Sequence, residues 1–163
     1  MPGTKKMASP HIAELLSYRL LVVSALLSRS QLMRFEPVSD ISHAEWRTLA
    51  LVGNFGPLSV KSLSRHAGLD FGQTSRLVSR MFEHGYIEKS RAEDGRSVIL
   101  SLTATGRALH RQLWAIAMRC NDEFLASLST AARKGLLEAL DTLAAKARAS
   151  LHAGRAKRPR TSR

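Results

Sequence analysis

Apolar residues recur at spacings of three and four along much of this chain, which is the period of a helix with one buried face. The first run extends from about residue 10 to residue 33, and Pro10 is tolerated in a first helical turn. A second helix is predicted to start at Ser42, because Ser42 and Glu45 have the spacing of a capping box. The segment from Gly53 to Pro57 ends that helix. Its predicted apolar face carries Trp46, Leu49, Ala50, Val52 and Phe55.

Two shorter helices with a tight turn between them come next. Ser59 can cap the first, and Gly68 ends it at a position suited to a left-handed backbone. Asp70 caps the second, which Gly85 ends. The inward face of this second helix is predicted to carry Leu77, Val78, Met81 and Phe82, and its polar outer face Gln73, Ser75, Arg76, Ser79 and Arg80. This order predicts a helix-turn-helix with a basic outer face.

Strand-forming residues follow this pair of helices. They begin at Tyr86 and return between Ser97 and Leu102, with turn-forming residues at 92–96, so we expect a two-stranded hairpin. A long helix is then predicted from a Thr103 cap, and a last amphipathic helix from Ser129 or Thr130. The pattern therefore predicts a mainly α fold with a small β-wing, in which a winged helix-turn-helix lobe spans about residues 42–102.

Length and composition favour one domain between two basic tails. The chain has 163 residues, of which 44% are hydrophobic, and we expect residues 10–151 to fold and the tails at 1–9 and 152–163 to be mobile. The net charge of +12 indicates a polyanionic partner, a membrane surface or solubilising tails. Residues 155–163 alone hold five positive charges. Two readings of the tails stay open: solvated ends, or non-specific contact with DNA phosphates.

Several classes of protein are disfavoured. The apolar run at residues 20–27 is far shorter than the roughly 20 residues of a membrane span, and no secretory signal pattern precedes it, so we expect a cytoplasmic protein that does not cross a membrane. The single cysteine, Cys120, has no partner for an internal disulfide and is expected to be buried or idle. The histidines lack metal-ligand spacing, so no metal or cofactor is expected. We find no catalytic motif and expect no enzyme.

The basic outer face matches what the major groove of DNA requires. The groove admits one helix, whose exposed N-terminal side chains reach base edges, where Gln pairs with adenine and Arg with guanine. A hairpin tip with Gly and Arg can place a guanidinium in the adjacent minor groove, and Arg96, together with Arg91, is the candidate. The candidate DNA-contacting residues are Ser59, Gln73, Thr74, Ser75, Arg76, Arg80, Arg91 and Arg96.

Three features are specific enough to indicate a family: GLDFGQTSRLVSRMFEHGYIEK at 68–89, AEDGRSVILSLTATG at 92–106, and six helices with one wing. With these features the chain resembles MarR-family transcriptional regulators over residues 11–150. It implies a homodimer joined through terminal helices at about 10–33 and 103–151. It also implies that Arg96 is the wing arginine and that Asp94, beside Gly95, holds the wing by pairing with an arginine such as Arg76. Many relatives have Arg-Ser early in the recognition helix, where this chain has Phe71 and Gly72, so its operator preference cannot be transferred.

The resemblance also implies interface and effector residues. The expected dimer interface includes Ile12, Leu16, Leu136, Leu140, Leu143 and Ala147. The expected effector pocket, for a small aromatic acid or its thioester, includes Tyr18, Arg19, His43, Trp46 and Arg47. Two alternatives stay open within this set: Trp46 and Trp114 as core residues rather than ligand-stacking ones, and Arg19 as an exposed or intersubunit charge rather than an anion ligand.

We therefore expect a homodimeric repressor that an effector releases from double-stranded DNA. Its operator would be a pseudo-palindrome with half-site centres about 34 to 36 Å apart. The alternative is a basic architectural protein that coats DNA without sequence preference.

Overall fold

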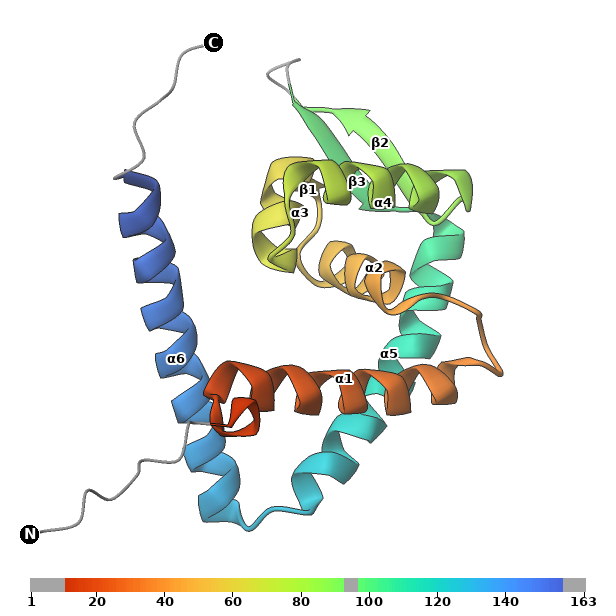
Figure 1. Cartoon of the computed structure of the whole chain (residues 1–163). Coiled ribbons are helices and arrows are strands. Elements are labelled where there is room, and N and C mark those ends of the chain that lie inside the picture. The colour runs from red at the N-terminus through yellow and green to blue at the C-terminus, as the bar shows by residue number, and fades with distance from the viewer. Residues whose placement is uncertain (1–10, 93–96, 157–163) are drawn as a thin grey trace, which may run out of the picture. The chain divides into compact units, whose positions relative to one another are not determined.

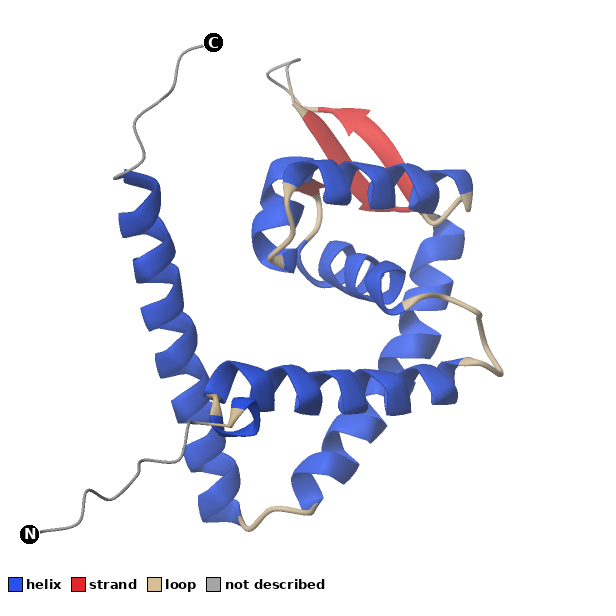
Figure 2. Ribbon diagram, in the orientation of Figure 1, coloured by secondary structure: helices blue, strands red, loops and turns tan. Residues whose placement is uncertain are grey.

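The computed structural model describes residues 11–92 and 97–156, and the chain divides into two compact units, residues 1–118 and 119–163. The elements in chain order are η1 (Ile12–Glu14), α1 (Leu16–Phe35), α2 (His43–Phe55), β1 (Leu58–Ser59), α3 (Val60–Ala67), α4 (Phe71–Glu83), β2 (Ile87–Arg91), β3 (Val98–Leu102), α5 (Ala104–Ala126) and α6 (Thr130–Ala156) (Figure 1). The predicted mainly α fold with a small β-wing is confirmed (Figure 2).

The helix starts of the first unit follow local capping chemistry. The Ser42 hydroxyl accepts from the Glu45 amide, and the Glu45 carboxylate accepts from the Ser42 amide at 3.0 Å, so the predicted capping box is present. The Asp70 side chain caps α4 by accepting from the Gln73 amide. Gly68 ends α3 with φ of 66°, the left-handed conformation that favours glycine.

The two terminal helices differ in extent from the prediction. α1 begins at Leu16 rather than near Pro10, because Leu15 is extended and a short 3-10 helix, η1, precedes it. It ends at Phe35. α6 continues to Ala156, so the last helix is longer than predicted and includes residues 152–156 of the predicted tail.

The wing contains one strand more than the hairpin predicted. β3 pairs antiparallel with β2, from Ile87 opposite Leu102 to Arg91 opposite Val98. On its other edge β3 pairs with the two-residue strand β1, which gives the order β1-β3-β2. β1 immediately precedes α3, so this pairing ties the start of the helix-turn-helix to the wing.

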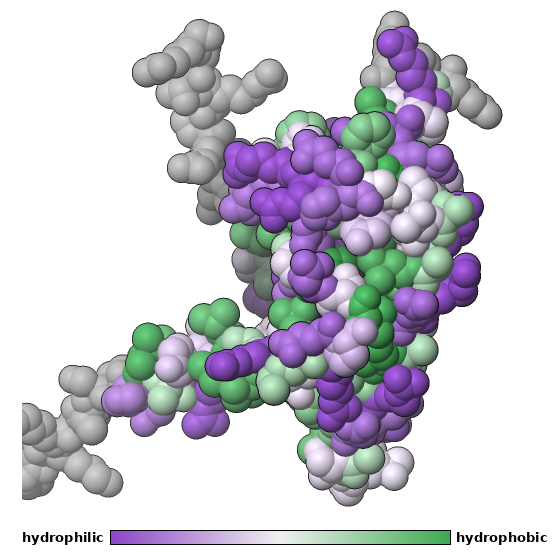
Figure 3. Space-filling view, turned by 90° about the vertical axis from the view of Figure 1, so that its right-hand side faces the viewer, coloured by the Kyte–Doolittle hydropathy of each residue, from purple (hydrophilic) through white to green (hydrophobic). Residues whose placement is uncertain are grey.

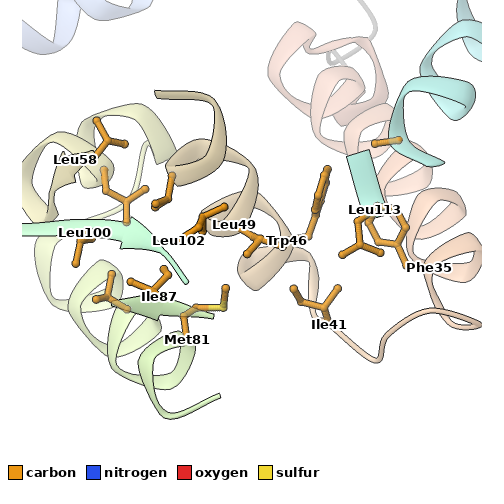
Figure 4. Packing of buried hydrophobic residues seen from close by; sticks show 14 residues of the cluster. Phe35, Ile41, Trp46, Leu49, Leu58, Met81, Ile87, Leu100, Leu102 and Leu113 are labelled. Carbon is orange, nitrogen blue, oxygen red and sulfur yellow. The ribbon is translucent and has the colours of Figure 1, made fainter. Parts of the chain in front are cut away.

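α2 lies at the centre of the hydrophobic core of the first unit. Leu49 lies with residues of the sheet and α4, and Trp46 lies on the side of Phe35 and Leu113 (Figure 4). The Phe35 and Trp46 rings meet edge to face with centroids 5.0 Å apart. The core consists of Phe35, Ile41, Trp46, Leu49, Val52, Leu58, Leu63, Val78, Met81, Ile87, Leu100, Leu102, Leu113 and Ala117.

Three aromatic residues predicted to face inward are not buried. Phe55 is 56% exposed and its ring stacks on His66, with centroids 4.8 Å apart. Phe82 is 49% exposed, and the Lys89 ammonium lies 4.6 Å from its ring centroid. Trp114, expected in the core, is 38% exposed. The apolar stripes are therefore narrower than the periodicity indicated, and the Phe55 and Phe82 rings at their edges pack against polar neighbours.

Candidate nucleic-acid interface

The helix α4 is anchored by one buried face. Thr74, Leu77, Val78 and Met81, spaced three and four apart, are its buried residues. The Asp70 carboxylate accepts from the Gln73 amide at 2.8 Å and thereby fixes the start of the helix. The residues between the buried positions are consequently turned outward: Gln73, Ser75, Arg76 and Arg80 are all exposed. Figure 3 shows that hydrophilic side chains gather at the height at which Figure 1 places α4 and the two long strands.

Thr74 does not belong to this exposed face, and its assignment as a DNA contact is wrong. It is 1% exposed, and its hydroxyl donates to the Asp70 carbonyl at 2.8 Å. The reason is its position, three and four residues before Leu77 and Val78, which puts it on the same side of the helix as the core.

The helix α3 contributes two cations that sequence reasoning missed. Lys61 and Arg65 are exposed and lie one turn apart, so they place two positive charges on the same side of α3. Their four-residue spacing on the polar side of α3 was the available signal. Ser59 is half-buried; its hydroxyl accepts from the Ser62 amide at 3.1 Å and donates to the Ser62 hydroxyl, so it serves mainly as a helix cap.

Two side chains of α2 hold the helix-turn-helix in place. Arg47, predicted for the effector pocket, donates to the Ala67 carbonyl at 3.0 Å and so satisfies the end of α3. Glu45 is buried at the start of α2, with its carboxylate 3.9 Å from both the Arg80 guanidinium and the His84 imidazole. Burial alone would raise the pKa of Glu45, but the hydrogen bonds from Ser42 and the charges of Arg80 and His84 lower it overall. Arg80 is thus engaged at the C-terminal half of α4.

The wing is described only in part. Arg91 is exposed at the end of β2, and the Ala92 amide donates to the Ser97 carbonyl at 2.8 Å across the hairpin. Asp94, Gly95 and Arg96 lie outside the described residues, and their roles stay predictions, as does the pairing of Asp94 with an arginine of α4.

The residues predicted for an effector pocket have separate surroundings. Tyr18 and Arg19 are exposed on α1, and Arg19 donates to the Ala13 carbonyl at 2.8 Å. His43 lies 3.4 Å from the Ser28 hydroxyl through Nε2, and burial, with the charge of Arg47, lowers its pKa. Trp46 is buried, in agreement with the core alternative.

An unpredicted histidine packs beside Trp46. The His110 ring stacks on Trp114 with centroids 5.7 Å apart and lies against Gly53, where an added Cβ would come within 2.6 Å of the imidazole. Burial, followed by the charge of Arg111, lowers the pKa of His110. The absence of a side chain at Gly53 in α2 thus leaves room for the His110 ring of α5. The sequence pattern did not reveal this contact.

The predicted dimer residues carry apolar surface at both ends of the chain. Ile12 and Leu16 are exposed in the first unit. In the second unit Leu136, Leu140, Leu143 and Ala147 are exposed on α6. Cys120 is buried, as expected.

Two features are absent from the residues that the structure describes. Within residues 11–92 and 97–156, no helix has the length and apolar character needed to cross a membrane. Over the same ranges, no group of three or more His, Cys, Asp or Glu side chains is arranged to hold a metal ion.

Comparison with known proteins gives consistent matches. A model of the MarR family matches residues 41–98. The organic hydroperoxide resistance transcriptional regulator of Bacillus subtilis is 33% identical over 86 residues, which cover 50% of this chain and 58% of that protein. The chain spans about half the length of the curated relatives it matches.

Solved structures extend the likeness to most of the chain. The PcaV transcriptional regulator of Streptomyces coelicolor, solved with its natural ligand, has a TM-score of 0.68 and 28% identity, and the match covers 86% of this chain and 99% of that one. A MarR/EmrR family transcriptional regulator from Acinetobacter sp. ADP1 has a TM-score of 0.77 at 24% identity, covering 85% and 98%.

Proposed function

We propose that this chain, because it belongs to the MarR family, is a transcriptional regulator that binds double-stranded DNA. The observation that carries the proposal is the division of α4 into a buried face and an exposed face with Gln73, Ser75 and Arg76 in its N-terminal half. These are the residue types and the part of a helix that read base edges in the major groove.

The neighbouring elements supply orientation rather than sequence reading. Lys61 and Arg65 on α3 neutralise phosphates of the same groove, and Arg91 directs the wing toward the adjacent backbone. Arg47 and Glu45 hold α3 and α4 against α2. Arg47 donates a hydrogen bond to the end of α3, and Glu45 forms an ion pair with Arg80 of α4. Arg96 enters the minor groove in this proposal, and Asp94 and Gly95 shape the wing tip.

We further propose that the active form is a cytoplasmic homodimer acting as a repressor. The exposed apolar residues of η1, α1 and α6 support the dimer, since large exposed apolar patches mark sites of interaction with another surface. Two copies would present two α4 helices to half-sites about one helical turn, 34 to 36 Å, apart. The two-fold symmetry of such an operator would mirror the two-fold axis of the dimer.

Release by a small aromatic acid or thioester completes the proposal. PcaV, 28% identical to this chain, was solved with its natural ligand, which supports a ligand-responsive regulator. Tyr18 and Arg19 on α1 and His43 on α2 are the side chains we propose to line the site. A coupling free energy of about 1 to 3 kcal/mol would weaken operator binding by roughly 5- to 150-fold.

Competition between specific and bulk DNA tests the function. A duplex is first selected from a random pool with the full chain, and its affinity is compared with that of unrelated DNA at moderate salt. A regulator prefers its site by about 1000-fold or more, whereas an architectural protein binds both alike. Equal affinities would refute the proposal.

Matched substitutions then test α4. Gln73→Ala is expected to relax base preference at one position of each half-site, at a cost of about 1 to 3 kcal/mol for a bidentate contact. Gln112→Ala makes the same change at an exposed position of α5 and is expected to leave binding unchanged. Arg76→Ala and Arg111→Ala form a second such pair. A uniform loss across all sequences for Gln73→Ala would reassign this residue to phosphate contact.

A further inference from the structure

We propose that Phe71 is a specificity-determining residue that reads the methyl group of a thymine in each half-site. Phe71 is the first residue of α4 and is 60% exposed. Helical side chains tilt toward the N-terminus of their helix, so the ring projects at the end of α4 that enters the groove. The inference rests on the proposed function, since it assigns a further reader to the same helix.

The packing of the other exposed phenylalanines shows that Phe71 is a different case. Phe55 stacks on His66, and Phe82 lies beneath the Lys89 ammonium. Among the described residues, Phe71 has no such ring or cation partner. Covering an exposed apolar ring with another apolar surface is favourable, because it removes apolar area from water.

The chemistry of the major groove identifies that surface. Of the groups displayed there, the thymine C5 methyl is the apolar one, and a phenylalanine ring is among the side chains that contact it. Arginine, glutamine and serine on the same helix are suited to the polar edges of the bases instead. Phe71 therefore complements the polar readers Gln73 and Arg76 and does not duplicate them.

Gly72 allows the ring to approach the bases. Gly72 itself adds no side chain to the surface beside Phe71, and the nearest side-chain atoms around an added Cβ, apart from those of its chain neighbours, would be the Asp70 carboxylate at 3.3 Å and the Arg76 guanidinium at 3.9 Å. A helix without a side chain there can lie deeper in the groove. The pair Phe71-Gly72 thus combines an apolar contact with close approach.

Replacing thymine by uracil in the selected duplex tests the inference, because uracil pairs identically but lacks the methyl group. Each thymine is changed in turn, and affinity is measured by fluorescence anisotropy. We expect the full-length protein to lose about fourfold at one position per half-site, and about 15-fold when both half-sites are changed, as for one buried methyl group each. Phe71→Ala is expected to bind the thymine and uracil duplexes equally, and Phe71→Leu to keep part of the difference.

Phe82→Ala is the matched control, since it removes an exposed phenylalanine from the far end of the same helix and is expected to keep the full difference between thymine and uracil. Circular dichroism checks that the variants fold. Indifference of the unmodified protein to every replacement, a selected site without thymine, or an unchanged difference in Phe71→Ala would each overturn the inference while leaving sequence-specific binding intact. Failure to select any sequence would overturn the proposed function and this inference together.

Discussion

Replacing Gly106 by alanine is expected to destabilise the junction between the wing and α5. Gly106 lies in the first turn of α5, where its amide donates to the Thr103 hydroxyl at 3.0 Å. A Cβ on Gly106 would fall 2.0 Å from the carbonyl oxygen of Tyr86. The added Cβ is fixed to the backbone of Gly106, and the oxygen belongs to the backbone of Tyr86, so no side chain can rotate away to make room.

The magnitude follows from three contributions. Overpacking at a tight contact costs about 1 to 3 kcal/mol. Moving the Tyr86 carbonyl also weakens the bond it accepts from the Thr103 amide at 3.1 Å, a loss of about 1 kcal/mol. Alanine in a helix recovers about 1 kcal/mol relative to glycine. The net destabilisation is therefore about 1 to 3 kcal/mol, or a fall in Tm of roughly 2 to 12 °C for a chain of this size.

Thermal unfolding at one fixed protein concentration measures this change, since association also alters Tm. Gly135→Ala is the matched control: it makes the same substitution in α6, where nothing lies within 4 Å of the added carbon. That control is expected to gain about 1 kcal/mol, a rise of roughly 2 to 4 °C. A Tm for Gly106→Ala equal to or above that of the unchanged protein, with the control stabilised, would refute the argument from close approach.

Two further predictions concern assembly and acid stability. Leu140→Asp places a charge on the exposed apolar face of α6 and is expected to give a folded monomer in light scattering, and a variant that stays dimeric would show that this face is not the interface. The pKa of Glu45 is lowered on folding, so its stabilisation is present above the ordinary value of 4.5 and is lost as the pH falls through the folded value. Urea unfolding of Glu45→Gln should accordingly show a deficit at pH 7 that shrinks below pH 4.5, and a deficit independent of pH would exclude the charge as its cause.

The features predicted correctly from sequence are those that a few adjacent residues determine. A capping box needs only Ser42 and Glu45, and a left-handed helix end needs only Gly68. The order of helices and strands likewise follows from local periods and turn residues. For this reason the winged helix-turn-helix and the outward direction of Gln73 and Arg76 were predictable without the structure.

The features missed depend on contacts between distant segments. β1 consists of two residues and is a strand only because β3 pairs with it. The contact between the His110 ring and Gly53 joins positions far apart in the chain. Phe82 is at the edge of an apolar stripe, and the position of that edge depends on where β2 packs and on Lys89 reaching the ring. A period gives the centre of a buried face but not its width.

Thr74 and Phe71 together revise the set of α4 residues that we propose to contact DNA. Polarity assigned Thr74 to the groove and left Phe71 without a role, yet the threonine satisfies its hydroxyl on the Asp70 carbonyl and is buried, whereas the phenylalanine is exposed. Because helix geometry and not polarity decides which side chains face outward, the residues that we propose to read DNA become Phe71, Gln73, Ser75 and Arg76. An operator derived for a relative with a polar first residue would then differ at the base pair that Phe71 contacts, which the uracil replacements identify directly.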